Sequence, residues 1–217
     1  MTYTLSDVLK DVGATVDQDA SDPTGTELTN RIQFANRSQE DWARSYKWKE
    51  LSTPWAPTVL VSMVSIGLPG DFNEFDGPIY DASLTSDNQY KLIGPSDKIR
   101  KTSTEKYAIV RGNLVSGKYL EIHPALASGV SLVGDYQSFP SSLTSLNEQP
   151  LAPREYMAKR IGYYVLEARS DSRFPIFKSD SEQTLLELIE SQDSPSEAED
   201  NRVPDWANKT GFRIGRD

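Results

Sequence analysis

The side chains that most often carry out chemistry in proteins are scarce in this sequence. The 217-residue chain has one histidine, His123, and no cysteine. Without cysteine there is no disulfide, zinc–thiolate site or thiol nucleophile, and a single histidine excludes a multi-histidine metal site. His123 precedes Pro124 at the end of an expected strand, which favours a packing or surface role. A Ser-His-acid triad would need this histidine, and the chain has no Gly-x-Ser-x-Gly motif.

Motifs for phosphate or metal binding are absent or incomplete. The sequence contains neither a Walker A motif nor a Gly-x-Gly-x-x-Gly loop. Oxygen-bearing residues at Asp71, Asn73, Glu74 and Asp76 are spaced like part of a calcium loop. Phe75 interrupts this set and no distal glutamate completes it, so a plain turn is favoured. We therefore predict no catalytic residue, no cofactor and no metal ion.

Tryptophan side chains could stack on sugars, and the chain has four of them: Trp42, Trp48, Trp55 and Trp206. The first three lie on the inner face of an expected helix or where that helix meets the expected sheet. Core packing is the better interpretation for these three.

Charge and hydropathy narrow the classes of partner. The net charge is −9, which argues against general affinity for nucleic acid, because such binding is dominated by cationic contacts to phosphate. A hydrophobic content of 37% is enough for a core. No run approaches eighteen apolar residues and the first residues do not resemble a signal peptide, so we expect no membrane segment.

Apolar periodicity predicts helices toward both ends of the chain. The longest follows Thr24-Gly-Thr-Glu27, which matches a capping box, and Ser179-Asp-Ser-Glu182 matches a second one. The expected helices are 6–12, 24–51, 152–169 and 179–192.

The middle of the chain has the pattern of short strands separated by Gly, Asn and Pro turns. Two of the strands, within 107–122, are expected to form a hairpin. The expected strands are 59–65, 79–80, 89–93, 107–111, 118–122 and 130–136.

These elements predict an α+β fold, in which an α-helical bundle formed by the N- and C-terminal helices carries an antiparallel β-rich insert and an extended C-terminal tail. The expected domains are N-terminal helices at 1–57, a β-rich insert at 58–148, C-terminal helices at 149–192 and a tail at 193–217. The tail turns from acidic to basic and has few bulky residues. It is either disordered or orders on a partner, in which case its isolated aromatic residues would be anchors in the partner's groove.

Several motifs together are similar to those of a known protein family. The sequence LTNRIQFANR at 28–37 leads to WKEL at 48–51, and LPGDF follows at 68–72. YLEIHP at 119–124 and GDYQSFP at 134–140 come before the closing helices. In order and spacing, these segments resemble the head-to-tail adaptors (connector or head-completion proteins) of tailed bacteriophages, over about residues 25–192. Gln39, within the apolar face of the long helix, and the segment 65–67 depart from the family pattern.

The resemblance implies a non-enzymatic virion protein. Such adaptors form a ring, commonly of about twelve copies, below the portal protein in the neck, extend the DNA channel and provide a platform for tail attachment. The implied partners are the portal, tail or stopper and nozzle proteins, and further copies of the chain, while DNA passes without specific binding. Assembly would take place in the host cytoplasm. The implied portal-binding residues lie in the tail: Trp206, Phe212, Arg213, Ile214 and Arg216.

Other functions stay open from the sequence. Within the same class, the chain could be another neck or tail-completion protein. A carbohydrate-binding or carbohydrate-active β protein would show an aromatic platform on its surface beside paired carboxylates. A cytoplasmic regulator would use the acidic part of the tail to bind a basic protein.

Overall fold

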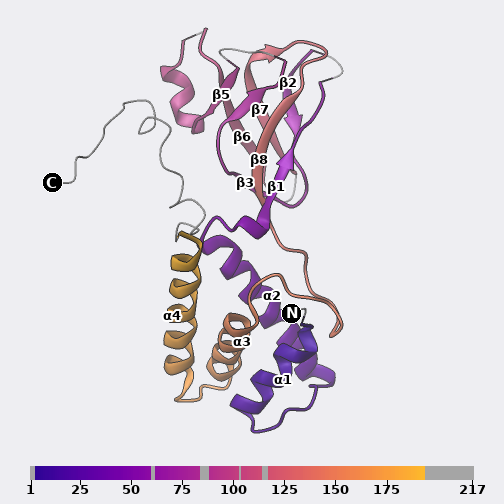
Figure 1. Cartoon of the computed structure of the whole chain (residues 1–217), viewed down its shortest axis with the longest axis vertical. Coiled ribbons are helices and arrows are strands. Elements are labelled where there is room, and N and C mark those ends of the chain that lie inside the picture. The colour runs from indigo at the N-terminus through magenta and orange to yellow at the C-terminus, as the bar shows by residue number, and fades with distance from the viewer. Residues whose placement is uncertain (1–2, 60–61, 84–87, 103, 114–116, 194–217) are drawn as a thin grey trace, which may run out of the picture.

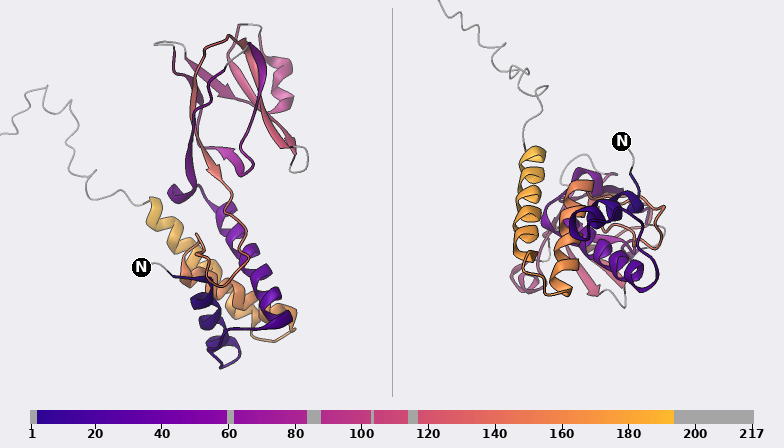
Figure 2. Two further views of the ribbon diagram at one scale, coloured as in Figure 1. Left: turned by 90° about the vertical axis from the view of Figure 1, so that its right-hand side faces the viewer. Right: turned by 90° about the horizontal axis from the view of Figure 1, so that it is seen from below.

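The computed structural model describes residues 3–59, 62–83, 88–102, 104–113 and 117–193. Within them the chain forms two bodies stacked along the long axis, a helical body and a sheet body (Figure 1). Each body has its own cluster of buried apolar side chains. The elongated outline is also visible from the side (Figure 2, left).

The helical body is organised around α3, which packs against each of the other three helices. Buried side chains from three of these helices meet in its core, among them Leu9, Trp42, Met157 and Ile161. Helix α4 contacts mainly α3 and lies at the side of the body (Figure 2, right). The helices are α1 (Leu5–Val16), α2 (Gly25–Ser45), α3 (Arg154–Ala168) and α4 (Phe174–Asp193).

Neither predicted capping box is present. Thr24 is the residue before α2, but its side chain makes no capping hydrogen bond. The segment 179–182 lies inside α4, where the Ser181 hydroxyl donates to the Lys178 carbonyl at 2.8 Å, so the helix continues through it. A capping box does occur at α1, where Thr4 and Asp7 bond reciprocally to each other's backbone amides.

Helix α2 ends at Ser45, earlier than its apolar pattern predicts. Tyr46 adopts extended backbone, and the indole of Trp48 folds back to donate to the Trp42 carbonyl at 2.6 Å. The Trp42 and Trp48 rings stack with their centroids 4.7 Å apart. Burial of this pair outweighs helix continuation, and a short 3₁₀ turn, η1 (Lys49–Leu51), leads into the sheet.

The sheet body is one sheet of eight strands in the order β1-β8-β4-β5-β6-β7-β2, with β3 also paired to β8. Most pairs are antiparallel, but β5 and β6 are parallel, separated by a second 3₁₀ segment, η2 (Pro95–Arg100). The strands are β1 (Ser52–Trp55), β2 (Met63–Gly67), β3 (Phe72–Phe75), β4 (Ile79–Asp81), β5 (Gln89–Leu92), β6 (Tyr107–Asn113), β7 (Gly117–Leu126) and β8 (Leu132–Ser138).

The sheet curls because its two edge strands, β1 and β2, follow one another in the chain. Between them the backbone runs along the turn that joins β7 to β8: the Val59 amide donates to the Val130 carbonyl at 2.8 Å, and the Gly129 amide donates to the Val59 carbonyl at 2.7 Å. The curled sheet encloses aromatic and aliphatic side chains, including Phe72, Ile79 and Tyr136.

The predicted fold class is wrong. We expected a helical bundle with an antiparallel β-rich insert, whereas the chain has a mixed α/β fold whose curled sheet has eight strands, one parallel pair and a core of its own. The reason lies in long-range pairing: β1 and β3 both join β8, more than sixty positions later in the chain. The proposed domain boundaries stay a prediction, and the C-terminal tail lies outside the described residues.

Two side-chain amides of α2 attach the long connection between β8 and α3 to the helical body. The Asn36 amide donates to the Leu143 carbonyl at 2.9 Å and accepts from the Leu143 amide at 2.6 Å. Gln39 donates to the Ser141 carbonyl at 3.0 Å and accepts from the Leu151 amide at 2.8 Å. The Gln39 side chain that interrupts the apolar face of the helix is therefore a fixed tether.

Candidate interaction surfaces

The residues predicted to bind the portal lie outside the part of the chain that the structure describes. Trp206, Phe212, Arg213, Ile214 and Arg216 all follow Asp193, where α4 ends. Their role stays a prediction. The surfaces considered below are those of the two bodies.

The residues weighed for chemistry have structural partners. His123 lies on β7, with its ring stacked on Tyr107 at 4.9 Å between centroids. Asp71 accepts a hydrogen bond from the Tyr136 hydroxyl at 3.1 Å, and Asp76 accepts from the Gln137 amide at 2.8 Å. Among the described residues, no three His, Cys, Asp or Glu side chains are grouped so that they could hold a metal ion.

Trp42, Trp48 and Trp55 are buried, in agreement with core packing. Trp55 contacts Phe75 edge-on at 5.4 Å inside the curled sheet. Buried rings are not accessible to a sugar, so these three tryptophans offer no stacking platform.

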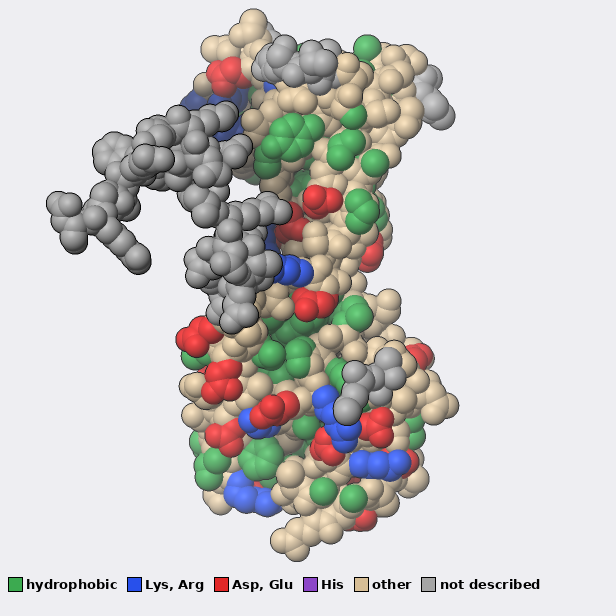
Figure 3. All heavy atoms as spheres, in the orientation of Figure 1, with side chains coloured by type: hydrophobic (Ala, Val, Ile, Leu, Met, Phe, Trp, Pro, Cys, Tyr) green, Lys and Arg blue, Asp and Glu red, His purple; other side chains and the backbone are tan. Residues whose placement is uncertain are grey.

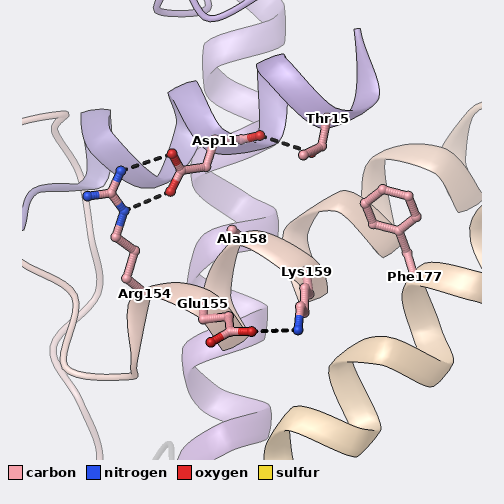
Figure 4. A pocket seen from close by; sticks show the side chains of 7 residues that line it. All are labelled: Asp11, Thr15, Arg154, Glu155, Ala158, Lys159 and Phe177. Carbon is pink, nitrogen blue, oxygen red and sulfur yellow. Dashed lines mark hydrogen bonds and ion pairs between the residues drawn. The ribbon is translucent and has the colours of Figure 1, made fainter. Parts of the chain in front are cut away.

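A groove of about 400 Å³ lies between α1 and α4, with α3 beneath it (Figure 4). Ala158 of α3 and Phe177 of α4 give it an apolar part, while Asp11 and Thr15 line it from α1. The groove exists because α1 and α4 each pack on α3 more than on one another.

The charged side chains around this groove are already paired. Arg154 holds the Asp11 carboxylate through two nitrogens, at 2.7 and 2.9 Å, and this contact raises the pKa of the guanidinium. Lys159 donates to Glu155 at 2.7 Å and to the Thr184 hydroxyl at 2.9 Å. Paired charges around an apolar patch suit binding of another surface better than proton transfer, which needs a group of perturbed pKa free to react.

Helix α4 rests on α3 through small residues. Ser181 and Thr184 are buried there, and Gly162 of α3 lies so close to the Phe177 ring that a Cβ at this glycine would be 2.8 Å from it. Leu186 is 55% exposed. It lies nine residues after Phe177, two and a half turns at 3.6 residues per turn, and so on the opposite side of α4 from the groove.

A second cavity, of about 280 Å³, lies between α2, α3 and α4 and contains a partly buried charge cluster. Arg160 bonds Asp41 through two nitrogens, the closer at 2.8 Å, and the Tyr164 hydroxyl donates to the same carboxylate. Burial, and then the hydrogen bond to Asp41, raise the pKa of Tyr164 to about 12. Because Arg160 pairs with Asp41 and the Tyr164 hydroxyl stays protonated, the cluster joins α2 to α3 rather than offering a reactive group.

No protein-family model matches this chain, and no curated protein matches it at a significant level. Across the described ranges, the helices are too short or too polar to cross a membrane.

Proposed function

We propose that this protein is a structural component of a tailed-phage neck, a head-to-tail adaptor that assembles as a ring below the portal. It works by binding proteins and carries out no reaction. The family assignment rests on the order of the sequence motifs between 28 and 140. The observation that carries the proposal is the pair of surfaces on opposite sides of α4, the groove beside Phe177 and the exposed Leu186.

Two different surfaces facing opposite ways are what a ring requires. In a cyclic assembly each subunit presents one surface to the copy before it and another to the copy after it. We assign the groove between α1 and α4 to the neighbouring copy, which would insert the outer face of its own α4.

The charges of the two surfaces are complementary. Leu186 is flanked one turn to either side by Glu182 and Glu190, which lie on the same outer part of α4. The groove has Arg154 and Lys159 at its rim, both partly exposed to solvent. An incoming acidic helix would share these cations with Asp11 and Glu155.

The C-terminal segment supplies the contact to the portal in this proposal, with Trp206, Phe212 and Ile214 as apolar anchors and Arg213 and Arg216 as charged ones. Aromatic and arginine side chains dominate binding energy at protein interfaces. Tail proteins would bind the opposite end of the ring.

The test is co-sedimentation of the protein with the portal encoded in the same genome. We expect the full chain to move with the portal, and a truncation ending at Gln192 to stay behind. In the full chain, Trp206→Ala combined with Phe212→Ala should weaken binding at least tenfold, while Tyr80→Ala, which removes an exposed aromatic ring of the sheet body, should not. Equal binding by the full chain and the truncation would contradict the role of the tail.

A further inference from the structure

One stretch of the sheet body has the opposite charge from the rest of the chain. Between residues 88 and 113 there are six basic residues and two acidic ones, a net charge of +4 in a chain whose net charge is −9. The stretch includes β5, η2 and β6. The excess of negative charge therefore lies elsewhere in the molecule.

The fold gathers part of this charge around one cleft. Lys91 of β5, Arg100 of η2 and Lys101 line a cleft of about 370 Å³ together with a single acid, Asp97. The parallel pairing of β5 with β6 makes this arrangement, because the link between them must cross over and carries η2 out from the sheet. Basic side chains are visible at the upper left of the sheet body, where η2 lies (Figure 3).

The cations of this cluster differ in how they are paired. Lys98 bonds Glu121 at 2.5 Å and Lys101 bonds Glu105 at 2.6 Å. Lys91 and Arg100 are exposed, and among the described residues no carboxylate lies within 4 Å of either. An unpaired, exposed cation keeps its full charge for a ligand and loses no existing ion pair on binding.

We propose that this basic cluster, Lys91, Lys98, Arg100 and Lys101, binds the phosphates of double-stranded DNA without reading its sequence. Phosphate contacts from lysine and arginine supply non-specific affinity for DNA. A membrane surface fits less well, because membrane-binding elements bury a broad apolar face and this cluster has one strongly exposed apolar side chain, Ile99. The choice of DNA over an acidic protein rests on the proposed function, which places duplex DNA next to the chain.

In the proposed ring, the basic and the acidic parts of each subunit would act on DNA in opposite ways. The cluster would place a ring of cations at the sheet body, while the acidic remainder of each subunit repels the duplex. Weak, sequence-independent contacts of this kind can centre or brake DNA without holding it at one site.

The test is fluorescence anisotropy of the full chain with a labelled duplex of random sequence at low salt. We expect binding that weakens by about 10- to 150-fold as salt rises fourfold, the dependence for two to four phosphate contacts. Lys91→Glu combined with Arg100→Glu should weaken it at least tenfold. Arg44→Glu combined with Lys49→Glu, which makes the same charge change at exposed sites beside the helical body, should have little effect.

Two outcomes would overturn the inference: no DNA binding at low salt, whether or not the protein binds anionic lipid vesicles, or an equal loss of DNA binding in both double variants. Portal binding, measured separately, distinguishes failure of the DNA inference from failure of the proposed adaptor role. If the Lys91→Glu, Arg100→Glu variant binds the portal and the wild-type protein does not bind DNA, only the DNA inference fails. If the wild-type protein binds DNA through the cluster but does not bind the portal, only the adaptor role fails.

Discussion

Gln39 illustrates how a polar residue can interrupt an apolar pattern and still stabilise the fold. Its side chain is buried, yet both ends of the amide bond the backbone of the connection between β8 and α3. Together with Asn36, one turn earlier, it fixes a long segment without secondary structure against α2.

We predict that Gln39→Leu lowers the free energy of unfolding by about 1–3 kcal/mol, because the Leu151 amide and the Ser141 carbonyl lose their partner. Urea unfolding followed by circular dichroism would measure the change. Gln183→Ala is the matched control, since among the described residues this exposed glutamine bonds only Glu187 on its own helix, and its effect should stay within about 0.5 kcal/mol. Equal effects of the two substitutions would refute the tether.

Two tyrosines, the partly buried Tyr3 and the buried Tyr164, predict how stability depends on alkaline pH. Burial raises the pKa of Tyr3 and of Tyr164 to about 12, against about 10 for an exposed tyrosine. Between these values the unfolded chain releases protons that the folded chain retains, so stability falls as pH rises from about 10 to 12 and is unaffected by these groups below 10. Denaturant unfolding at a series of pH values would detect this loss. Tyr164→Phe should make stability fall less steeply over this pH range. An unchanged fall would argue against the burial of Tyr164 as its cause.

At the scale of elements, the contact between α3 and α4 depends on small residues. Gly162 lets the Phe177 ring lie directly on α3, and Ser181 and Thr184 let the two helices approach. The apolar pattern of α4 did not reveal this arrangement, because its most buried side chains are polar.

Gly162→Ala tests the close approach. On an open helix face this change would stabilise the protein by about 1 kcal/mol through helix propensity. We expect no gain, or a loss of up to about 2 kcal/mol, because the new Cβ would be 2.8 Å from the Phe177 ring. In a background that carries Phe177→Ala, the same substitution should be stabilising. Thermal unfolding of the wild-type protein, the two single variants and the double variant would measure these changes. If Gly162→Ala stabilises the protein in both backgrounds, the contact is ruled out.

The sequence predicts local elements better than their partners. The helices at 24–51 and 152–169 are present with shorter ends, and the hairpin within 107–122 is present as β6 and β7. Part of the expected strand 59–65 is present, since residues 63–65 lie in β2, whereas Val59 bonds the turn from β7 to β8. β3 was missed because its residues, Phe72–Phe75, are also those of a turn or calcium-loop pattern. Such pairings depend on distant residues, which local periodicity does not contain.

The candidate surfaces were also only partly predictable. The six basic residues between 88 and 113 are evident in the sequence, but the overall charge of −9 concealed them. The groove at Ala158 and Phe177 was not predictable, because it depends on which helices pack against α3.

At the scale of the whole molecule, two bodies with separate cores are joined by two chain crossings. The first runs through η1 into β1, and the second leaves β8, where the Ser138 hydroxyl donates to the Leu51 carbonyl at 3.1 Å. This arrangement separates the proposed assembly surfaces on the helices from the basic cluster at the sheet, so that each would be able to contact a different partner.

The proposed ring requires both opposite surfaces, the groove and the outer face of α4, so a change in either one should disrupt assembly. Ala158→Glu places a charge in the groove and Leu186→Glu places one on the outer face of α4, so each should reduce the number of copies bound per portal severalfold. Val64→Glu, at a similarly exposed apolar residue on β2 of the sheet body, should not. Mass photometry of portal complexes would count the copies, with circular dichroism as the check of folding. A normal number of copies per portal in both the Ala158→Glu and the Leu186→Glu variant would contradict the assigned interface.

The most direct test of the adaptor role is electron microscopy of the portal mixed with this protein. The proposed function predicts an added ring of density below the portal, formed by the full chain and absent when the chain ends at Gln192. A portal without added density, in the presence of either form at micromolar concentration, would contradict it.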